Sequence, residues 1–406
     1  MSEGLGSVAP VQRRLEARTL PFLVVLVAIG LADAVTASYL VLFAADELRL
    51  DPIEVGVATS VFTLSGILLG VVAGRWVDRL RTRRPLMLGL VLASAGFAGF
   101  TFVRGFVPLL VVCVLAGSIN LGFPQIFALE HMSRSGESAS ATAFLRGGWS
   151  VAWALGPVLA GGVVLAFGYS FLFGGAAVLL VVAAIGVRWL PRPAGIAHRD
   201  AAEGARPRSA VALPLAAVLL FHAAMFIGSF VLPLLVTREL SASSGWVGVV
   251  FGACAAVEVL VSLGLASAAG RFPPEAGLLG AAAAFVLYFA GLWIAPDLPW
   301  VLGLQLLRGF AIAMMGILGI ELLQRLLAPR IASATALFAN ALAAGSLVAG
   351  VTAGVLVQAV GLRSTVAVCG GIAGLAVLCL LLDIGLRRRP ATPTGSPTAT
   401  VTRAGE

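Results

Sequence analysis

The chain alternates long apolar runs with short polar breaks. Twelve such runs recur along it, and a run of about 20 apolar residues is long enough to cross the ~30 Å hydrocarbon core of a bilayer as a helix. The pattern therefore predicts an all-α membrane protein with twelve transmembrane helices. Their expected cores are 20–43, 54–76, 86–103, 107–129, 141–167, 170–190, 212–236, 246–269, 276–295, 300–323, 334–359 and 364–386.

Composition supports a membrane protein and argues against an enzyme. Hydrophobic residues make up 60% of the chain and charged residues 11%, and the mean hydropathy is +1.03, far from the usage of soluble domains. The four cysteines lie in apolar runs without metal-ligand spacing, so they are interpreted as core residues. Scattered histidines and the lack of a phosphate-binding glycine loop also predict no metal, cofactor or polytopic-enzyme site. The three histidines are His131, His198 and His222.

The charges are distributed unevenly between the two sides of the membrane. The formal charge of +8 comes from 27 basic residues, all arginines, against 19 acids. The arginines cluster in both tails, in the connection between helices 2 and 3 and in the connection between helices 6 and 7. With twelve helices these regions share one side, so the positive-inside rule places both termini in the cytoplasm. The basic balance thus reflects topology and not nucleic-acid binding.

An internal repeat divides the chain into two halves. "SATA" at Ser140–Ala143 recurs at Ser333–Ala336, and the same offset of 193 relates Pro21 to Pro214. Two parallel six-helix repeats are the architecture of major facilitator transporters, whose substrate site lies at the midplane between the halves. The expected organisation is a cytoplasmic tail at 1–19, bundles at 20–190 and 211–388, a cytoplasmic linker at 191–210 and a disordered cytoplasmic tail at 389–406.

The connection between helices 2 and 3 resembles the loop signature of major facilitator transporters. In "GRWVDRLRTRR" the residues Gly74, Asp78 and Arg79 match, whereas the expected turn glycine is missing and one residue is inserted. A carboxylate at a helix end can bind arginine and a neighbouring helix N-terminus. We interpret the three residues as a conformational latch and the remaining arginines of the loop as determinants of topology.

Four charged residues lie well inside the apolar runs, away from their ends. Asp33 and Glu258 are deep in helices 1 and 8, and Arg146 and Arg308 are in helices 5 and 10. A charge at the bilayer centre costs about 2.5–3.5 kcal/mol on insertion scales, so each requires a partner or a function. We expect at least one ion pair across the halves, with Arg146–Glu258 as the first choice. Asp33 and Glu258 are the candidates for carrying a proton, and Arg146 and Arg308 are candidates for binding substrate.

Helix 5 carries a possible sugar site. Arg146, Trp149 and Trp153 are spaced by three and four residues and so share a helix face. Indole rings stack on sugars and guanidinium donates to hydroxyls; the alternative is packing in the core or against lipid. The following Gly156 and Pro157 resemble, displaced by one residue, the helix-5 signature of major facilitator antiporters. We expect them to allow close helix approach and to bend the helix.

Uncharged hydrogen-bonding side chains recur at a similar depth. They are Asn120, Gln125, Gln305 and Asn340. Buried amides also hold membrane helices together, and this alternative stays open. Near cavity-lining helices, however, they favour a polar, uncharged substrate.

Several blocks resemble the bacterial sugar efflux transporters. They are "PQIFALE", "FLRGGWSVAWALGP", "GACAAVEV", "LGLQLLRG" and "SATALFAN". The resemblance implies export of sugars or their analogues, with protons moving in the opposite direction by antiport. We expect the protein to be a monomer in the bacterial inner membrane. Asp33 and Arg308 are charges that the resemblance does not predict, and a multidrug or other small-molecule exporter of the same fold is the alternative. The matching positions are Pro124, Gln125, Arg146, Trp153, Gly156, Pro157, Glu258, Gln305 and Asn340.

Overall fold

The computed structural model describes residues 8–80, 82–133, 139–191, 209–267 and 273–387. The described secondary structure is entirely helical. The long helices of the first half are α1 (Val8–Leu42), α2 (Pro52–Leu80), α3 (Arg84–Phe100), α4 (Phe106–Ala116), α5 (Gly122–Met132) and α6 (Ala139–Gly186). Those of the second half are α7 (Ser209–Leu234), α8 (Gly245–Ser267), α9 (Pro274–Trp293), α10 (Leu298–Leu326), α11 (Ile331–Val360) and α12 (Leu362–Arg387). Short π or 3₁₀ helices are η1 (Phe43–Glu47), η2 (Gly117–Leu121), η3 (Val187–Trp189) and η4 (Leu235–Glu239).

The helices match the predicted membrane crossings. Within the described residues, ten helical segments are long and apolar enough to cross a membrane, and the apolar helix Arg84–Phe100 is shorter. One of the ten, Phe144–Trp189, is 46 residues long and contains two helices joined at Gly168, whose φ of 80° favours glycine. The long segment counts as two crossings and the shorter helix Arg84–Phe100 adds one, so the helices agree with twelve crossings. The protein is a multi-pass membrane protein. Most of the predicted linker and C-terminal tail lie outside the described residues.

The fourth crossing differs from its predicted uninterrupted run at 107–129. Its two parts, α4 and α5, are joined by the 3₁₀ helix η2. Ser118 Oγ donates to the carbonyl oxygens of Leu115, at 2.6 Å, and Gly89, at 2.8 Å. Side-chain hydrogen bonds of this kind compete with the helical pattern. The hydropathy of the run carries no sign of this break.

The backbone repeats the predicted internal symmetry. Both α1 and α7 end in a π-helix, and the two π-helices are 192 residues apart. Among the described residues, two non-glycine residues have a positive φ, Arg49 at 55° and Ser241 at 51°. They too are 192 residues apart. Gly168 and Gly361, with φ of 80° and 84°, are 193 apart. The two halves therefore follow the same path, as parallel repeats do.

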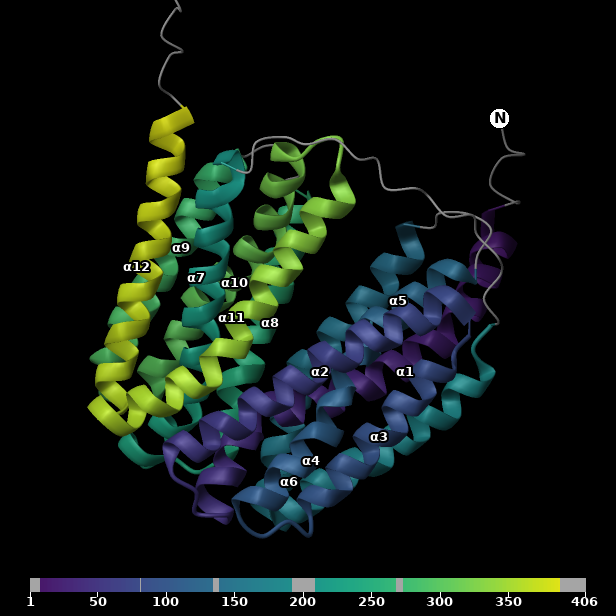
Figure 1. The fold of residues 1–406 in the computed structure, drawn as a ribbon, viewed down its shortest axis with the longest axis horizontal. Helices are drawn as coiled ribbons and strands as arrows, with labels where there is room; N and C mark the ends of the chain where they lie inside the picture. Colours follow the sequence, from purple (N-terminus) through teal and green to yellow (C-terminus); the bar gives the residue numbers. More distant parts are fainter. Residues whose placement is uncertain (1–7, 81, 134–138, 192–208, 268–272, 388–406) are drawn as a thin grey trace, which may run out of the picture.

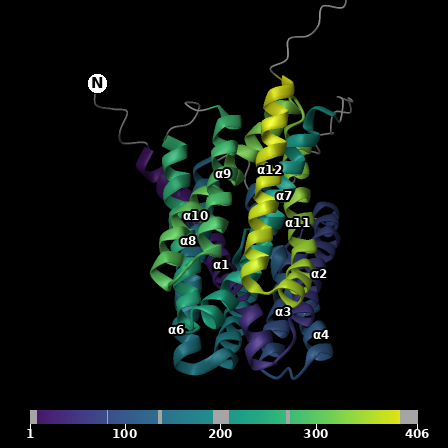
Figure 2. The same ribbon diagram turned by 90° about the vertical axis from the view of Figure 1, so that its left-hand side faces the viewer.

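The two six-helix bundles meet near one end and diverge toward the other (Figure 1). We call the end with Arg84, Leu190 and Arg387 the tail face and the end with Asp46 and Arg238 the distal face. Seen from the second bundle, the helices run between these two faces (Figure 2). Each bundle has an aromatic core. The larger rings are Phe43, Phe97, Phe100 and Phe173 in the first bundle and Phe221, Phe285, Tyr288 and Phe289 in the second.

Close backbone contacts join the bundles toward the distal face. The most extensive contacts between the halves are those of α2 with α11 and of α6 with α8. A Cβ atom on Gly248 of α8 would lie 2.0 Å from the carbonyl oxygen of Pro157, and one on Gly56 of α2 would lie 2.4 Å from that of Gly350. Glycine at these positions lets the backbones approach closely, as in other membrane helix pairs.

Candidate functional site

A charged cluster lies within the second bundle. Arg308 of α10 is 4% exposed, and its Nη2 donates to Ser229 Oγ of α7 at 2.8 Å. The ring of Phe251 of α8 lies 4.9 Å from the guanidinium carbon. Arg308 also interacts electrostatically with Glu258 of α8. Three helices thus place one guanidinium between an aromatic face, a hydroxyl and a carboxylate.

Glu258 has a second partner on its own helix. The thiol of Cys254, one turn away, donates to Glu258 Oε1 with a sulfur–oxygen distance of 3.4 Å. The sequence contained the signal for this contact, because a spacing of four places both residues on one helix face. The apolar run around Cys254 predicts only a core residue there. Ser229 and Tyr288 were also missed, although Tyr288 is one of only three tyrosines in the chain.

The expected ion pair between Arg146 and Glu258 is not formed in the structure. Among the described residues, the arginine that interacts with Glu258 is Arg308, from the same bundle. Arg146 is exposed near the tail-face end of α6. The helices α6 and α8 do contact each other, as expected, but around Gly248 and Pro157. Arg146 lies near the start of α6, at the end where the bundles diverge (Figure 1).

An aromatic group in the first bundle contains the two predicted tryptophans. The ring centroids of Trp149 and Trp153 are 6.3 Å apart, and Phe123 meets Trp149 edge-on at 4.7 Å. A Cβ atom on Gly30 of α1 would lie 3.2 Å from the Trp149 ring, so glycine makes room for it. The indole of Trp153 interacts with the carboxylate of Asp33, although its Nε1 makes no hydrogen bond of standard geometry. The proximity of the Trp149 and Trp153 rings agrees with the helix face that the sequence predicts them to share.

The predicted amides occupy different surroundings. Gln125 of α5 is buried, and neither of its terminal atoms has a hydrogen-bond partner among the described residues. Gln305 of α10 donates to the carbonyl oxygen of Val301 at 2.9 Å and lies beside Tyr288. Asn120 and Asn340 are exposed. The structure thus brings Gln305 to the charged cluster and leaves Asn340 outside it.

Several buried polar atoms of the described residues lack good hydrogen-bond partners. They include Arg308 Nη1, Gln305 Oε1 and Trp153 Nε1. Leaving such an atom unsatisfied costs about 1–3 kcal/mol, and more for a charged group. Both donors and acceptors are present, so a ligand rich in hydroxyl groups offers matching partners. These atoms, from α6 of the first bundle and α10 of the second, are the candidate substrate-binding groups.

The latch and the helix-bending residues are only partly described. Gly74 lies in α2, whereas the side chains of Asp78 and Arg79 fall outside the described residues. Arg83 of the same connection donates to the carbonyl of Leu190, which ties α3 to the end of η3. Gly156 and Pro157 lie within α6, whose non-helical residue is Gly168. The predicted close approach is present, since a Cβ atom on Gly156 would lie 2.8 Å from that of Ala34.

These features define a membrane transporter built from two repeated bundles, and the comparisons with known proteins agree. The family model of the Major Facilitator Superfamily matches residues 22–330. The chain belongs to this superfamily, and it is therefore a transporter and not an enzyme.

Named relatives are sugar efflux transporters. A Deinococcus radiodurans protein, named provisionally as a sugar efflux transporter, is 30% identical over 386 residues, which are 89% of this chain and 96% of that protein. Sugar efflux transporter C of Escherichia coli is 28% identical over 374 residues, with 89% of this chain and 94% of that protein covered. The chain is thus similar to these proteins over most of its length.

Solved structures share the fold. A crystal structure of the nucleoside transporter NupG matches with a TM-score of 0.75 at 12% identity, covering 89% of this chain and 99% of that one. A transporter of the POT family, in complex with 5-aminolevulinic acid, matches with a TM-score of 0.75 at 11% identity over 91% of this chain and 96% of that one. At these identities the likeness concerns the fold alone.

Proposed function

We propose that the protein exports sugars or sugar-like solutes from the bacterial cytoplasm by alternating access, with protons moving inward in exchange. The observation that carries the proposal is the Arg308–Glu258 cluster, in which Arg308 Nη1 is buried without a good hydrogen-bond partner. A sugar oxygen would supply that partner. The names of the relatives support sugars as the substrate class.

Competition for Arg308 would link the two fluxes. Substrate and Glu258 would both interact with the Arg308 guanidinium. Sugar binding would therefore weaken the interaction between Arg308 and the Glu258 carboxylate. The exposed fraction of Glu258 is intermediate, and proton coupling requires that water reaches this exposed part. We assign Glu258 as the first candidate for proton coupling and Asp33, beside Trp153, as the second.

The orientation completes this proposal. The arginine bias favours a cytoplasmic tail face in the inner membrane, and we expect the transporter to act as a monomer. In that orientation the bundles are in contact near the outside and diverge toward the cytoplasm (Figure 1). An exporter awaiting cytoplasmic substrate adopts this arrangement. The Gly74–Asp78–Arg79 latch would then form when the cytoplasmic ends come together.

Counterflow in proteoliposomes tests the substrate class. Purified protein should exchange labelled for unlabelled mono- or disaccharides, because both halves of the site present hydrogen-bonding groups. A panel of lipophilic cationic drugs tests the alternative exporter. Drug exchange without exchange of any sugar would overturn the proposal.

The Trp153 indole N–H is expected to contribute to sugar affinity. Trp153→Phe keeps an aromatic ring but removes the N–H, so KM should rise about threefold to tenfold, as expected for loss of one hydrogen bond. Initial transport rates in proteoliposomes measure this change. Trp189→Phe is the control, because Trp189 is 71% exposed at the end of η3. Equal KM values for the two variants would contradict the assignment.

The contact between α6 and α8 is expected to tolerate no added methyl group at Gly161. A Cβ atom there would lie 2.7 Å from both the Gly245 carbonyl oxygen and Tyr39 Oη, whereas one on Gly162 meets nothing within 4 Å. Overpacking costs about 1–3 kcal/mol, so Gly161→Ala should slow sugar transport about tenfold while Gly162→Ala transports normally. Transport rates decide this, and equal rates would show that the contact is not needed.

A further inference from the structure

Charged side chains gather where the bundles meet at the distal face. Arg238 Nη2 of η4 donates to Asp46 Oδ1 of η1 at 3.1 Å. Asp46 belongs to the first half and Arg238 to the second. Among the described residues, this is the one ion pair that joins the two halves; the others lie within the second half.

The two partners occupy equivalent positions in the repeat. Asp46 and Arg238 are 192 residues apart, the same separation as that of the π-helices in which they lie and of the positive-φ residues that follow them. Parallel repeats are related by an axis along the membrane normal. Equivalent residues contact each other only close to such an axis. The pair therefore lies at the pseudo-two-fold axis, where the repeat carries opposite charges.

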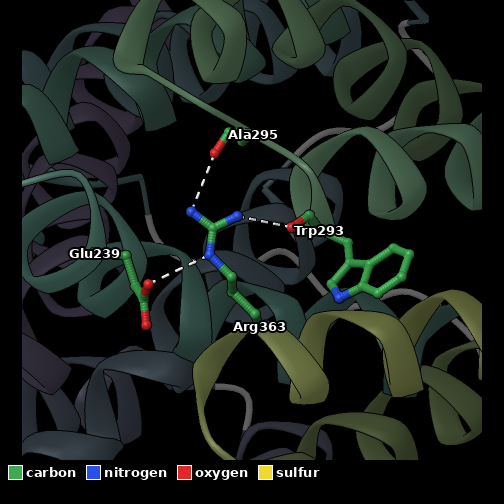
Figure 3. Close-up of polar contacts among 4 residues, drawn as sticks. All are labelled: Glu239, Trp293, Ala295 and Arg363. Carbon is green, nitrogen blue, oxygen red and sulfur yellow. Dashed lines mark hydrogen bonds and ion pairs between the residues drawn. The ribbon is translucent and has the colours of Figure 1, made fainter.

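A neighbouring arginine keeps Glu239 away from this pair. Arg363 of α12 donates through Nε to Glu239 at 3.3 Å, through Nη1 to the Trp293 carbonyl oxygen at 2.9 Å and through Nη2 to that of Ala295 at 3.2 Å (Figure 3). All four residues belong to the second half. Glu239 adjoins Arg238 in sequence, and its carboxylate would otherwise compete with Asp46 for the Arg238 guanidinium. Because Arg363 binds Glu239, Arg238 stays available to the first half.

Uncharged contacts around the pair join the same two halves. Tyr39 Oη donates to the Ser244 carbonyl oxygen at 3.1 Å. Ser60 Oγ of α2 donates to the Leu347 carbonyl oxygen of α11 at 3.1 Å and accepts from the Val351 N–H at 3.1 Å. These contacts must separate when the distal face opens. The ion pair is the member of this set that depends on charge.

We propose that Asp46 and Arg238 form a clasp at the pseudo-two-fold axis that holds the distal face closed and shifts the balance between the two access states. Side-chain exposures of 41% and 46% make it a solvated pair, which is worth up to about a fivefold change in an equilibrium. A change of that size is enough to tune a transporter whose two states are close in free energy.

Single-molecule energy transfer between the distal loops tests the clasp. Labels carried by non-canonical amino acids at Phe102 and Ile294, which are 81% and 59% exposed, report the separation of the halves in nanodiscs. Asp46→Arg and Arg238→Asp should each raise the distal-open to distal-closed ratio about fivefold, because each creates a like-charge pair. The double exchange interchanges the side chains between equivalent positions, so its ratio should return to within about twofold of wild type.

Two further measurements keep the result decisive. In 1 M salt, screening should raise the distal-open population of the wild type but not of Asp46→Asn, which also serves if a charge-reversed variant does not fold. Reversing Glu321 and Arg325, an ion pair within α10, should not change the distance. Single variants that leave the ratio unchanged, or a double exchange no closer to wild type than the singles, would overturn the clasp. The distance is measured without substrate, so the result does not depend on whether sugars are exported.

Discussion

Glu258→Gln should abolish proton-driven sugar export while leaving the protein in the membrane. Glutamine keeps the size and much of the hydrogen-bonding capacity of the side chain but does not exchange a proton. Loss of a proton-carrying group lowers proton-transfer steps on the order of 100-fold or more, so gradient-driven accumulation should fall to the passive level. Cys254 and Arg308 still surround the amide, and the helix packing is retained.

The measurement compares accumulation with exchange. Sugar accumulation in inside-out vesicles should be lost in Glu258→Gln, whereas counterflow, which needs no net proton movement, should persist. Glu321→Gln is the matched control, because Glu321 forms an exposed ion pair with Arg325 within α10. Wild-type accumulation by Glu258→Gln would remove Glu258 from proton coupling and leave Asp33 as the candidate.

Arg308→Lys should weaken sugar binding even though it keeps the positive charge. The guanidinium donates to Ser229 and still has a buried Nη1 without a good partner, and a single ammonium does not reproduce this fork. Hydrogen bonds to charged groups contribute about 1.5–3 kcal/mol, so affinity should fall at least about tenfold. Equilibrium binding of labelled sugar measures the loss. Arg104→Lys is the control, since Arg104 donates only to the neighbouring Val103 carbonyl oxygen among the described residues.

A neutral replacement separates binding from stability. Arg308→Met leaves Glu258 without the cation that interacts with it, so the variant should lose thermal stability. Adding Glu258→Gln should recover much of the lost thermal stability but not sugar binding. Unchanged sugar affinity in Arg308→Lys, or binding restored by the double variant, would contradict a substrate role for Arg308.

The architecture was predictable from the sequence because it depends on the hydropathy and repetition of whole segments and not on single residues. Apolar run lengths placed the membrane crossings, and the "SATA" repeat gave the same offset that relates Gly168 to Gly361 in the structure. The 3₁₀ interruption at Gly117–Leu121 was not predictable from hydropathy, because it depends on side-chain hydrogen bonds made by Ser118 after packing.

Individual residues of the candidate site were predicted from the sequence, but the contacts between them were not. Charge in an apolar run identified Glu258 and Arg308, yet the choice of Arg146 as the partner of Glu258 required the relative tilt of the bundles. Hydropathy does not contain that tilt. The Asp46–Arg238 pair was not accessible either, because the sequence offset of 193 relates Asp46 to Glu239. The local separation of 192 is visible only in the backbone, from the two π-helices.

Sugar flux under an imposed pH gradient tests proton-driven sugar export most directly. Inside-out vesicles have a lumen that corresponds to the outside of the cell, so protons leaving an acidic lumen should drive labelled sugar inward. The account predicts accumulation above the external concentration when the lumen is acidic, and collapse of that accumulation when an uncoupler is added. Sugar that only equilibrates, at the same rate with and without the gradient, would contradict it.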